Sequence, residues 1–317
     1  MPKRALICGI SGQDGAYLSE LLLGKGYEVV GSSRDAEGSE FRNLRRFGLY
    51  ERIRLVSMNL TDFRSVLQVL AQTQPDEIYN LAGQSSVALS FEQPIDTFES
   101  ITVAALNLLE AIRFGGRPAR LYNACSSECF GDTGEAAANE ETPFRPRSPY
   151  ATGRAAAFWA AANYREAYGL HACSGILFNH ESPLRPARFV TRKIVGAACR
   201  IARGSKERLS LGSLSIVRDW GWAPEYVEAM WRMLLADKPR DYVVATGEAH
   251  SLEDLVAEAF GALGLDWRTH VDPDSALGRP SDPRAVRGDP RRIAADLGWK
   301  AQTRMPALVR KLIEAEK

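Results

Sequence analysis

Short, largely apolar segments alternate with longer amphipathic ones along the first 178 residues. The short segments are five to seven residues long and predict buried β-strands over residues 4–8, 28–33, 54–58, 77–82, 119–124 and 172–178. The longer segments repeat apolar residues at helical spacing and predict helices over residues 16–25, 62–73, 96–114 and 150–168. Strands that alternate with helices predict an α/β fold built on a doubly wound parallel sheet with right-handed crossovers.

The pattern changes after residue 178. Residues 179–192 are rich in Pro, Arg and His and predict a loop, which a helix over 193–203 and a strand-like run over 208–212 follow. The tail predicts two amphipathic helices and a Pro/Arg-rich loop over 278–290, whereas residues 241–245 could return to the main sheet. We therefore expect a cofactor domain over residues 1–178, with a returning segment near 240–250. Residues 179–317 would form a smaller, partly interleaved α/β substrate domain.

Composition excludes several classes of protein. The 317 residues carry a net charge of only +1, so no overall field favours nucleic acid or a membrane surface. No apolar run approaches the ~20 residues of a membrane helix, and no signal peptide precedes the first strand. His171, His250 and His270 lack metal-ligand spacing, so we expect no metal site. The cysteines have neither CxxC nor zinc spacing and indicate reduced thiols in a cytoplasmic protein; they are Cys8, Cys125, Cys129, Cys173 and Cys199.

A glycine loop follows the first predicted strand and opens the first helix, with the sequence GISGQDG over residues 9–15. This context can place a pyrophosphate over a helix N-terminus, which predicts a dinucleotide site in a Rossmann-type fold. The spacing is GxxGxxG rather than GxGxxG, and a plain tight turn is the alternative interpretation.

The end of the second strand bears on cofactor choice. Sites that prefer NAD usually carry an acid there for the ribose 2′-hydroxyl, but this chain has Ser32, Ser33 and Arg34. A neutral site beside a guanidinium suits a 2′-phosphate, which favours NADP over NAD. A solvated pair between Arg34 and Asp35 is the alternative.

Two further pairs of residues carry candidate chemistry. Tyr150 and Arg154 lie one helical turn apart, so the guanidinium would favour the phenolate and make a base that works near neutral pH. Ser126 and Glu128 follow the fifth strand at its carboxyl end, where ligands bind in open parallel sheets. Their alternate spacing would let both face one cleft, although Ser126 could equally be a helix cap.

Basic residues recur in the second half of the chain. An arginine held by a neighbouring acid, as in the RDWG string at residues 218–221, can present a fork to phosphate. Each such residue alone is more often a solvated charge. The candidates are Arg185, Arg192, Lys193, Arg218 and Arg279.

Taken together, these motifs resemble the extended short-chain dehydrogenase/reductase family. Within it they are most similar to the GDP-mannose 4,6-dehydratase family, and the resemblance covers nearly the whole chain. The strings that carry it lie at residues 9–18, 79–85, 127–128, 147–150, 175–183, 189–193 and 218–221.

The resemblance implies a reaction in which the cofactor is regenerated. Tyr150 would take the C4 hydroxyl proton of GDP-mannose while NADP accepts the C4 hydride. Glu128 would remove the C5 proton and assist loss of the C6 hydroxyl as water, after which the hydride returns to C6. The product would be GDP-4-keto-6-deoxymannose. Ser126 stands at the family's catalytic threonine and Arg154 at its lysine.

The resemblance also implies two sets of binding residues and a homo-oligomer, either dimer or tetramer. Cofactor contacts would come from Gly9, Gly12, Gln13, Asp14, Gly15, Arg34, Asn59, Leu60, Leu81, Ala82, Ser85, Tyr150 and Arg154. Contacts to the GDP-sugar substrate would come from Ser85, Asn179, Glu181, Val190, Lys193, Arg218, Arg279 and Asp282.

The chain departs from the family pattern at several positions. Arg154 replaces a lysine, Asn59 replaces an aspartate, Ser213 replaces an asparagine and Asp282 replaces a glutamate. Two alternatives to a GDP-mannose dehydratase therefore stay open at this point. One is a GDP-4-keto-6-deoxysugar reductase or a dehydratase of another GDP sugar. The other is a weakly active homologue that binds NADP and nucleotide sugar.

Overall fold

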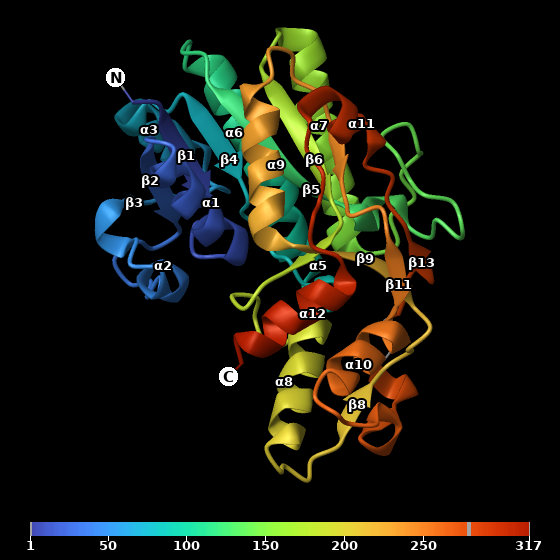
Figure 1. The fold of residues 1–317 in the computed structure, drawn as a ribbon. Helices are drawn as coiled ribbons and strands as arrows, with labels where there is room; N and C mark the ends of the chain where they lie inside the picture. Colours follow the sequence, from blue (N-terminus) through green and yellow to red (C-terminus); the bar gives the residue numbers. More distant parts are fainter. Residues whose placement is uncertain (1, 278–279, 317) are drawn as a thin grey trace.

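A parallel sheet forms the centre of the molecule. The computed structural model describes residues 2–277 and 280–316. In this part of the chain the sheet has seven strands, in the order β10-β6-β5-β4-β1-β2-β3 (Figure 1). The strands are β1 (Arg4–Cys8), β2 (Glu28–Ser33), β3 (Arg54–Ser57), β4 (Glu77–Asn80), β5 (Arg120–Ser126), β6 (Ala172–Leu177) and β10 (Tyr242–Val244). Every pairing is parallel, so the predicted α/β class and the six predicted strands are confirmed.

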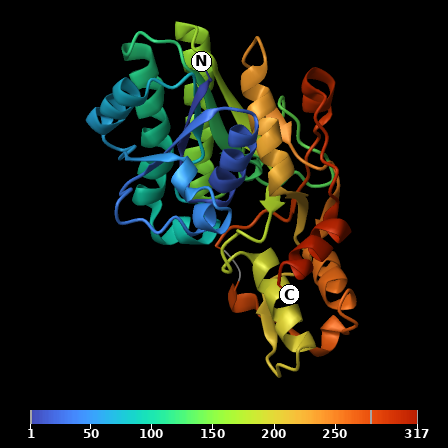
Figure 2. The same ribbon diagram turned by 60° about the vertical axis from the view of Figure 1, so that its left-hand side comes forward.

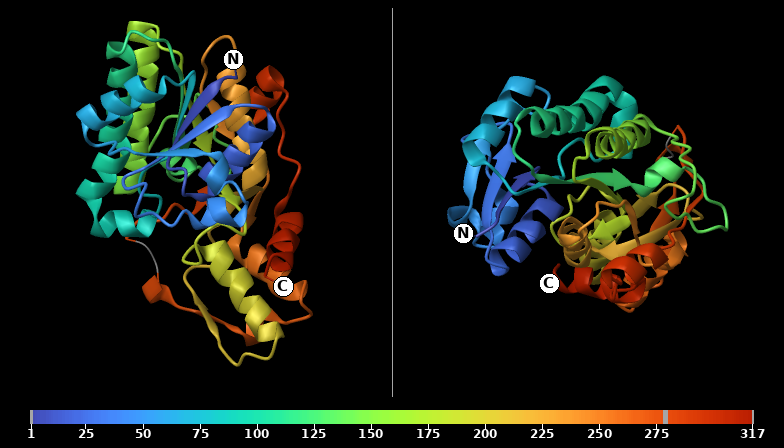
Figure 3. Two further views of the ribbon diagram at one scale, coloured as in Figure 1. Left: turned by 90° about the vertical axis from the view of Figure 1, so that its left-hand side faces the viewer. Right: turned by 90° about the horizontal axis from the view of Figure 1, so that it is seen from above.

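Helices cover both faces of this sheet because successive strand residues point to opposite sides. Ala5 and Ile7 of β1 join one apolar core with α1 (Gln13–Gly24) and α9 (Ala223–Leu235). Leu6 and Cys8 join the other core. The helices packed there are α3 (Phe63–Thr73), α6 (Ala104–Phe114) and α7 (Pro149–Tyr168). Figure 3 shows the two helical layers with the sheet between them.

A C-terminal lobe, defined by its own apolar core, lies beyond the carboxyl ends of the strands (Figures 1 and 2). It contains α8 (Val190–Ala202), β8 (Leu209–Leu211), α10 (Leu252–Gly261), β12 (Val271–Pro273) and α12 (Met305–Glu314). A small sheet joins the lobe to the main sheet. Its strands are β7 (Asn179–Glu181), β9 (Val217–Trp222), β11 (Ala249–Ser251) and β13 (Ala285–Val286).

The remaining elements are short. They are the helices α2 (Arg42–Arg46), α4 (Val87–Glu92), α5 (Pro94–Phe98) and α11 (Arg291–Leu297), with single helical turns at Tyr50–Arg52, Glu99–Val103, Ser127–Phe130, Trp267–Thr269 and Ser275–Leu277. None of the helices in the described ranges is long and apolar enough to cross a membrane.

Several sequence predictions are corrected by the structure. The single helix expected over 96–114 is interrupted by a π-helical turn at Glu99–Val103 between α5 and α6. The loop expected over 179–192 contains β7, because Asn179–Glu181 pairs with β9, and α8 begins at Val190 rather than at residue 193. The sequence prediction also lacked α9, although this helix packs beside α1 on the main sheet.

Stability measurements can test whether α9 belongs to the main core. Met230 is fully buried in that core, whereas Leu235 at the end of the same helix is 39% exposed. We expect Met230→Ala to lower the free energy of unfolding by about 2–5 kcal/mol, since it leaves a cavity. The control Leu235→Ala should cost less than about 1 kcal/mol in the same urea titration. Equal effects of the two substitutions would contradict the packing described for α9.

Candidate active site

A cavity of about 980 Å³ lies where the carboxyl ends of the main strands face the C-terminal lobe. We call it the interdomain cavity. The main-sheet side contributes Asp14, Ser126, Glu128, Tyr150 and Arg154, and the other side contributes residues of α8 and of the segments around β8 and β13. Its volume suits a large organic ligand, and its place at the strand ends is where open parallel sheets bind ligands.

The start of α7 places Tyr150 in this cavity. The Ser148 hydroxyl accepts a hydrogen bond from the Ala151 amide at 3.1 Å, and Pro149 occupies the first turn. A serine cap followed by proline begins a helix at a defined residue, so Tyr150 always falls in the first turn. Its side chain lines the cavity.

Arg154 lies one turn further along α7 and is 5% exposed. Its Nη1 donates to the Ala124 carbonyl at 2.8 Å, and its Nη2 donates to the Ala82 carbonyl at 3.5 Å. The centre of the guanidinium is 5.4 Å from the centroid of the Tyr150 ring. Arg154 therefore joins α7 to the backbone that follows β4 and to the end of β5, with its charge beside the phenol ring.

Ser126 and Glu128 line the same cavity, and both sequence interpretations of Ser126 apply. Its hydroxyl accepts from the Glu128 amide at 3.3 Å, which caps the turn Ser127–Phe130, and its side chain also lines the cavity. The Glu128 carboxylate is 3.9 Å from Nε of the buried Arg218. Arg218 also donates through Nη2 to Asp282 at 2.7 Å, so it lies between two carboxylates.

The glycine loop has no room for side chains at two positions. Gly9 has φ +83°, and a Cβ on it would lie 2.9 Å from the Ala82 nitrogen. A Cβ on Gly15 would lie 2.6 Å from the Ile10 backbone. Backbone amides at the N-terminus of α1 thus lie close to the chain that follows β4, which makes the loop suited to hold a diphosphate.

His180 is a site residue that sequence reasoning missed, although it lies inside the 175–183 string. It is buried, its Nε2 is 2.9 Å from Asp14 Oδ2, and its Nδ1 is 2.8 Å from the Phe178 carbonyl. Both ring nitrogens face acceptors, which suits the imidazolium form. Burial lowers the pKa of His180, but the Asp14 carboxylate outweighs it and the pKa is raised. Burial likewise opposes ionisation of Asp14, yet His180 holds the pKa of that carboxyl below its usual value.

Gln13 connects this pair to the chain after β7. Its Nε2 donates to Asp14 at 3.0 Å and to the His180 carbonyl at 3.2 Å, and its Oε1 accepts from the Ser182 hydroxyl at 2.7 Å. The His180 ring stacks on Tyr226 of α9 at 4.7 Å between centroids. The beginning of α1 is therefore held by polar contacts to the segment around His180, which lines the interdomain cavity.

The remaining predicted cofactor residues divide into two groups. Leu81 and Ser85 line the interdomain cavity. The others follow the strands β1 to β4 along the same sheet edge, outside the lining of that cavity; they are Gly9, Gly12, Gln13, Gly15, Arg34, Asn59, Leu60 and Ala82.

Asp35 bears on the prediction made for Arg34. Its Oδ1 accepts from the amides of Glu37 at 3.1 Å and Gly38 at 2.8 Å, so this carboxylate is occupied within its own turn. Arg34 is exposed directly after β2.

The predicted substrate residues gather on the lobe side. The residues that line the cavity are Asn179, Glu181, Val190, Lys193 and Asp282. Arg218 is outside this lining but lies against Glu128 and Asp282, which belong to it. The Glu181 carboxylate accepts from Thr191 and lies 3.0 Å from Arg185 Nε, and Lys193 donates to the Ser210 carbonyl at 2.7 Å. Arg279 lies outside the described residues. Among those that are described, no cluster of histidine, cysteine or acidic side chains could hold a metal ion.

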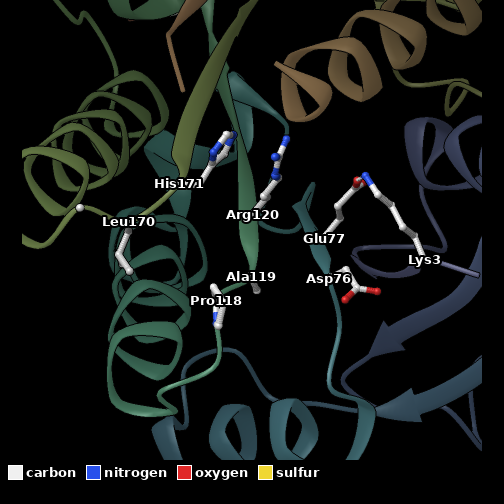
Figure 4. Close-up of a pocket in the computed structure, with 9 residues that line it drawn as sticks. Lys3, Asp76, Glu77, Pro118, Ala119, Arg120, Leu170 and His171 are labelled. Atoms are coloured by element: carbon white, nitrogen blue, oxygen red, sulfur yellow. Dashed lines mark hydrogen bonds and ion pairs between the residues drawn. The ribbon is translucent and has the colours of Figure 1, made fainter. Parts of the chain in front are cut away.

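A second, smaller hollow of about 410 Å³ lies at the opposite edge of the main sheet, by the amino ends of its strands (Figure 4). Lys3 and Glu77 point toward one another there at 3.0 Å, and Arg120 donates to the Leu234 carbonyl at 2.6 Å. Burial and the nearby Arg120 lower the pKa of His171 to about 4, so its ring is neutral. We take the interdomain cavity as the candidate active site, because Tyr150, Glu128 and Ser126 all line it.

The chain is similar to known proteins over nearly its whole length. A model of the protein family described as GDP-mannose 4,6 dehydratase matches residues 6–312. The chain is 48% identical to GDP-mannose 4,6 dehydratase 2 of Arabidopsis thaliana, over 99% of this chain and 87% of the relative. It is 43% identical to GDP-mannose 4,6-dehydratase of Sinorhizobium fredii, over 99% of this chain and 96% of that one. The human GDP-mannose 4,6 dehydratase is 40% identical, over 98% and 91%.

Solved structures share the fold. UDP-glucose 4-epimerase of Thermus thermophilus, in complex with NAD, matches with a TM-score of 0.86 at 26% identity, over 99% of this chain and 98% of that one. RMD from Pseudomonas aeruginosa, complexed with NADPH, matches with a TM-score of 0.81 at 23% identity, over 99% and 98%.

The His180–Asp14 pair predicts a pH-dependent stability. The raised pKa of His180 gives stabilisation that is complete below its unfolded value near 6.5 and is lost as pH rises through the folded value. The lowered pKa of Asp14 gives stabilisation that is complete above about pH 4 and is lost as pH falls through the folded value. Asp14→Asn should therefore cost about 1–3 kcal/mol near pH 5.5 and less near pH 9 in denaturant titrations.

Glu20→Gln is the matched control, because Glu20 is exposed on the same helix. Its effect should be the same at both pH values. A cost of Asp14→Asn that is equal at the two pH values would contradict the ionised pair.

Proposed function

Because the chain belongs to the GDP-mannose 4,6-dehydratase family, we propose that the interdomain cavity is its active site. The enzyme is a hydro-lyase that converts GDP-mannose into GDP-4-keto-6-deoxymannose. The observation that carries the assignment of the site is that Tyr150, Ser126 and Glu128 line one cavity at the strand ends. A reductase needs no carboxylate base at C5, so the position of Glu128 favours a dehydratase.

The chain works with a nicotinamide cofactor, and we propose that the cofactor is NADP. The glycine loop after β1 suits a dinucleotide, since it leads into the N-terminus of α1 and packs at Gly9 and Gly15 too closely against neighbouring backbone to admit a Cβ. Arg34 is exposed after β2, and Asp35 is occupied by the amides of its own turn. A guanidinium whose neighbouring carboxylate is already engaged supports 2′-phosphate recognition. The residues that would hold the cofactor are Gly9, Gly12, Gln13, Asp14, Gly15, Arg34, Asn59, Leu60, Leu81, Ala82, Ser85, Tyr150 and Arg154.

When bound, the nicotinamide supplies reversible hydride transfer, from C4 in the first half of the reaction and to C6 in the second. Tyr150 takes the proton of the C4 hydroxyl, and the Ser126 hydroxyl donates a hydrogen bond to that oxygen. Arg154 lies beside the Tyr150 ring, and its bonds to Ala82 and Ala124 hold it in place. The C4 ketone makes the C5 proton acidic. Glu128 removes that proton and delivers a proton to the C6 hydroxyl, which leaves as water.

The lobe side of the cavity would hold the nucleotide sugar. Basic side chains at this side favour a diphosphate, and the buried Arg218 presents a guanidinium that two carboxylates orient. We propose that Asn179, Val190, Lys193, Arg218, Arg279 and Asp282 bind the GDP moiety, and that Ser85 and Glu181 contact the sugar. On this basis residues 1–178, with the returning strand near 240–250, serve the cofactor and residues 179–317 serve the nucleotide sugar.

We also propose that the enzyme is a cytoplasmic homo-oligomer. Large apolar side chains are exposed on the helices α5 to α7 at the side of the main sheet: Ile95, Phe98, Leu106, Phe114, Trp159 and Tyr168. Exposed apolar patches of this kind commonly mark association surfaces, and symmetric homo-oligomers are the commonest assemblies.

Turnover of GDP-mannose tests the function. Purified enzyme with GDP-mannose and catalytic NADP should form a 4-keto sugar, detected by its alkali-induced absorbance. Glu128→Gln should lower kcat by about 10²- to 10⁴-fold while leaving the affinity for NADP unchanged, because only the C5 base is lost. Glu135→Gln, in an exposed loop, is the control and should keep full activity. Undiminished dehydration by Glu128→Gln would overturn the assigned role, and turnover of another GDP sugar but not of GDP-mannose would overturn the substrate.

Two substitutions of Arg154 test whether its positive charge contributes to catalysis. Arg154→Met removes the cation beside the Tyr150 phenol and should lower kcat by about 10²- to 10³-fold. Arg154→Lys keeps the charge and should retain kcat within about tenfold of the wild-type enzyme. Steady-state rates at saturating GDP-mannose and NADP measure both. A methionine variant with wild-type kcat would show that Tyr150 works without the cation.

A further inference from the structure

Two cysteines flank the proposed catalytic residues Ser126 and Glu128. Cys125 is next to last in β5 and Cys129 lies in the turn Ser127–Phe130, so the local sequence is CSSEC. Their sulfur atoms are 3.6 Å apart. The proposed mechanism uses neither thiol, and the other cysteines, Cys8, Cys173 and Cys199, are free and buried elsewhere in the fold.

The same two thiols also contact the helix that carries Tyr150. The Cys129 thiol donates to the Ala151 carbonyl at 3.4 Å, and the Cys125 thiol donates to the Arg154 carbonyl at 3.8 Å. These carbonyls belong to the two turns of α7 that contain Tyr150 and Arg154. The sulfur pair therefore lies between α7 and the segment formed by the end of β5 and the turn Ser127–Phe130. The proposed reaction depends on the relative position of these two segments.

We propose that Cys125 and Cys129 form a reversible oxidation site, at which a hydroperoxide converts the thiol pair into a disulfide and stops the reaction. Cys125 lines the interdomain cavity, so a small oxidant can reach it there. Its sulfur attacks the peroxide, the O–O bond breaks and water leaves, giving a sulfenic acid. The Cys129 sulfur then displaces a second water to form the S–S bond. Two thiols and one hydrogen peroxide thus give one disulfide and two waters.

Cys129 suits the second step. Cys129 is fully buried, whereas Cys125 lines the cavity, so the oxidant meets Cys125 first. Its contact with Cys125 at 3.6 Å makes it the thiol available for resolution of the sulfenic acid.

Closure of the disulfide would disturb the catalytic geometry. The sulfur separation falls from 3.6 Å to about 2.05 Å, which draws the turn that carries Glu128 toward the end of β5. The hydrogen bonds that both thiols donate to α7 are lost in the same step. A displacement on the order of 1 Å at a catalytic group can cost about a hundredfold in rate. We therefore expect oxidation to lower kcat by about that factor.

Peroxide treatment of the whole enzyme tests this inference, which rests on the proposed function for its activity readout. The untreated enzyme first establishes GDP-mannose turnover. After hydrogen peroxide treatment, intact mass should fall by about 2 Da, since two thiol hydrogens are lost, and peptide mapping should identify the Cys125–Cys129 disulfide. Activity should be lost in proportion and should return with dithiothreitol. The mass readout does not depend on turnover, so a failed activity assignment and a failed thiol assignment can be told apart.

Variants define the outcomes that would overturn the inference. Cys129→Ala and Cys125→Ser should each keep activity through peroxide treatment that inactivates the wild-type enzyme. Cys173→Ala, at an equally buried position outside the pair, should remain as sensitive as the wild-type enzyme. The inference is wrong if inactivation proceeds equally in Cys129→Ala, if the disulfide forms without loss of activity, or if prolonged treatment leaves both thiols reduced.

Discussion

The position of Arg154 is the constraint on which the proposed chemistry depends. Its buried guanidinium bonds to the backbone carbonyls of Ala82 and Ala124, at the ends of two neighbouring strands. Removing one partner of a buried charge is costly, so these bonds hold α7 against the sheet edge. The same helix carries Tyr150, and the same strand end carries Ser126. A single side chain thus links the helix that carries the proposed C4 base to the strand end that carries Ser126.

Polar contacts hold other parts of the cavity wall in place. Gln13 and Asp14 at the start of α1 bond to the segment around His180, whose ring stacks on α9. Further out, Arg218 lies between Glu128 and Asp282. Buried polar networks that are satisfied in this way are rigid. The proposed base at C5 therefore lies against Arg218 of β9, in the small sheet that joins the C-terminal lobe to the main sheet.

The local features of this site could be predicted from the sequence because they depend on neighbours along the chain. A strand that ends at Cys8 and a glycine loop that opens α1 follow from apolar spacing and from the tolerance of glycine for positive φ. Ser148 followed by proline predicts the start of α7, and with it the place of Tyr150 and Arg154 on one face. Parallel strands end at one edge, so Ser126 and Glu128 were expected at the carboxyl ends of the strands, and both line the interdomain cavity there.

Other features required the folded chain, since they arise between residues far apart in sequence. The pairing of Asn179–Glu181 with β9 turned an expected loop into a strand, and α9 covers the main sheet although its segment follows the change of pattern at residue 178. His180 became a site residue only because folding brought it to Asp14, 166 positions away. The sequence motif predicts Arg154 near Tyr150, but its two backbone partners lie far away in sequence: Ala124 is in β5, and Ala82 is in the segment that follows β4. Spacing along one chain specifies which residues share a helix or an edge, whereas long-range packing alone specifies what each side chain meets across the cavity.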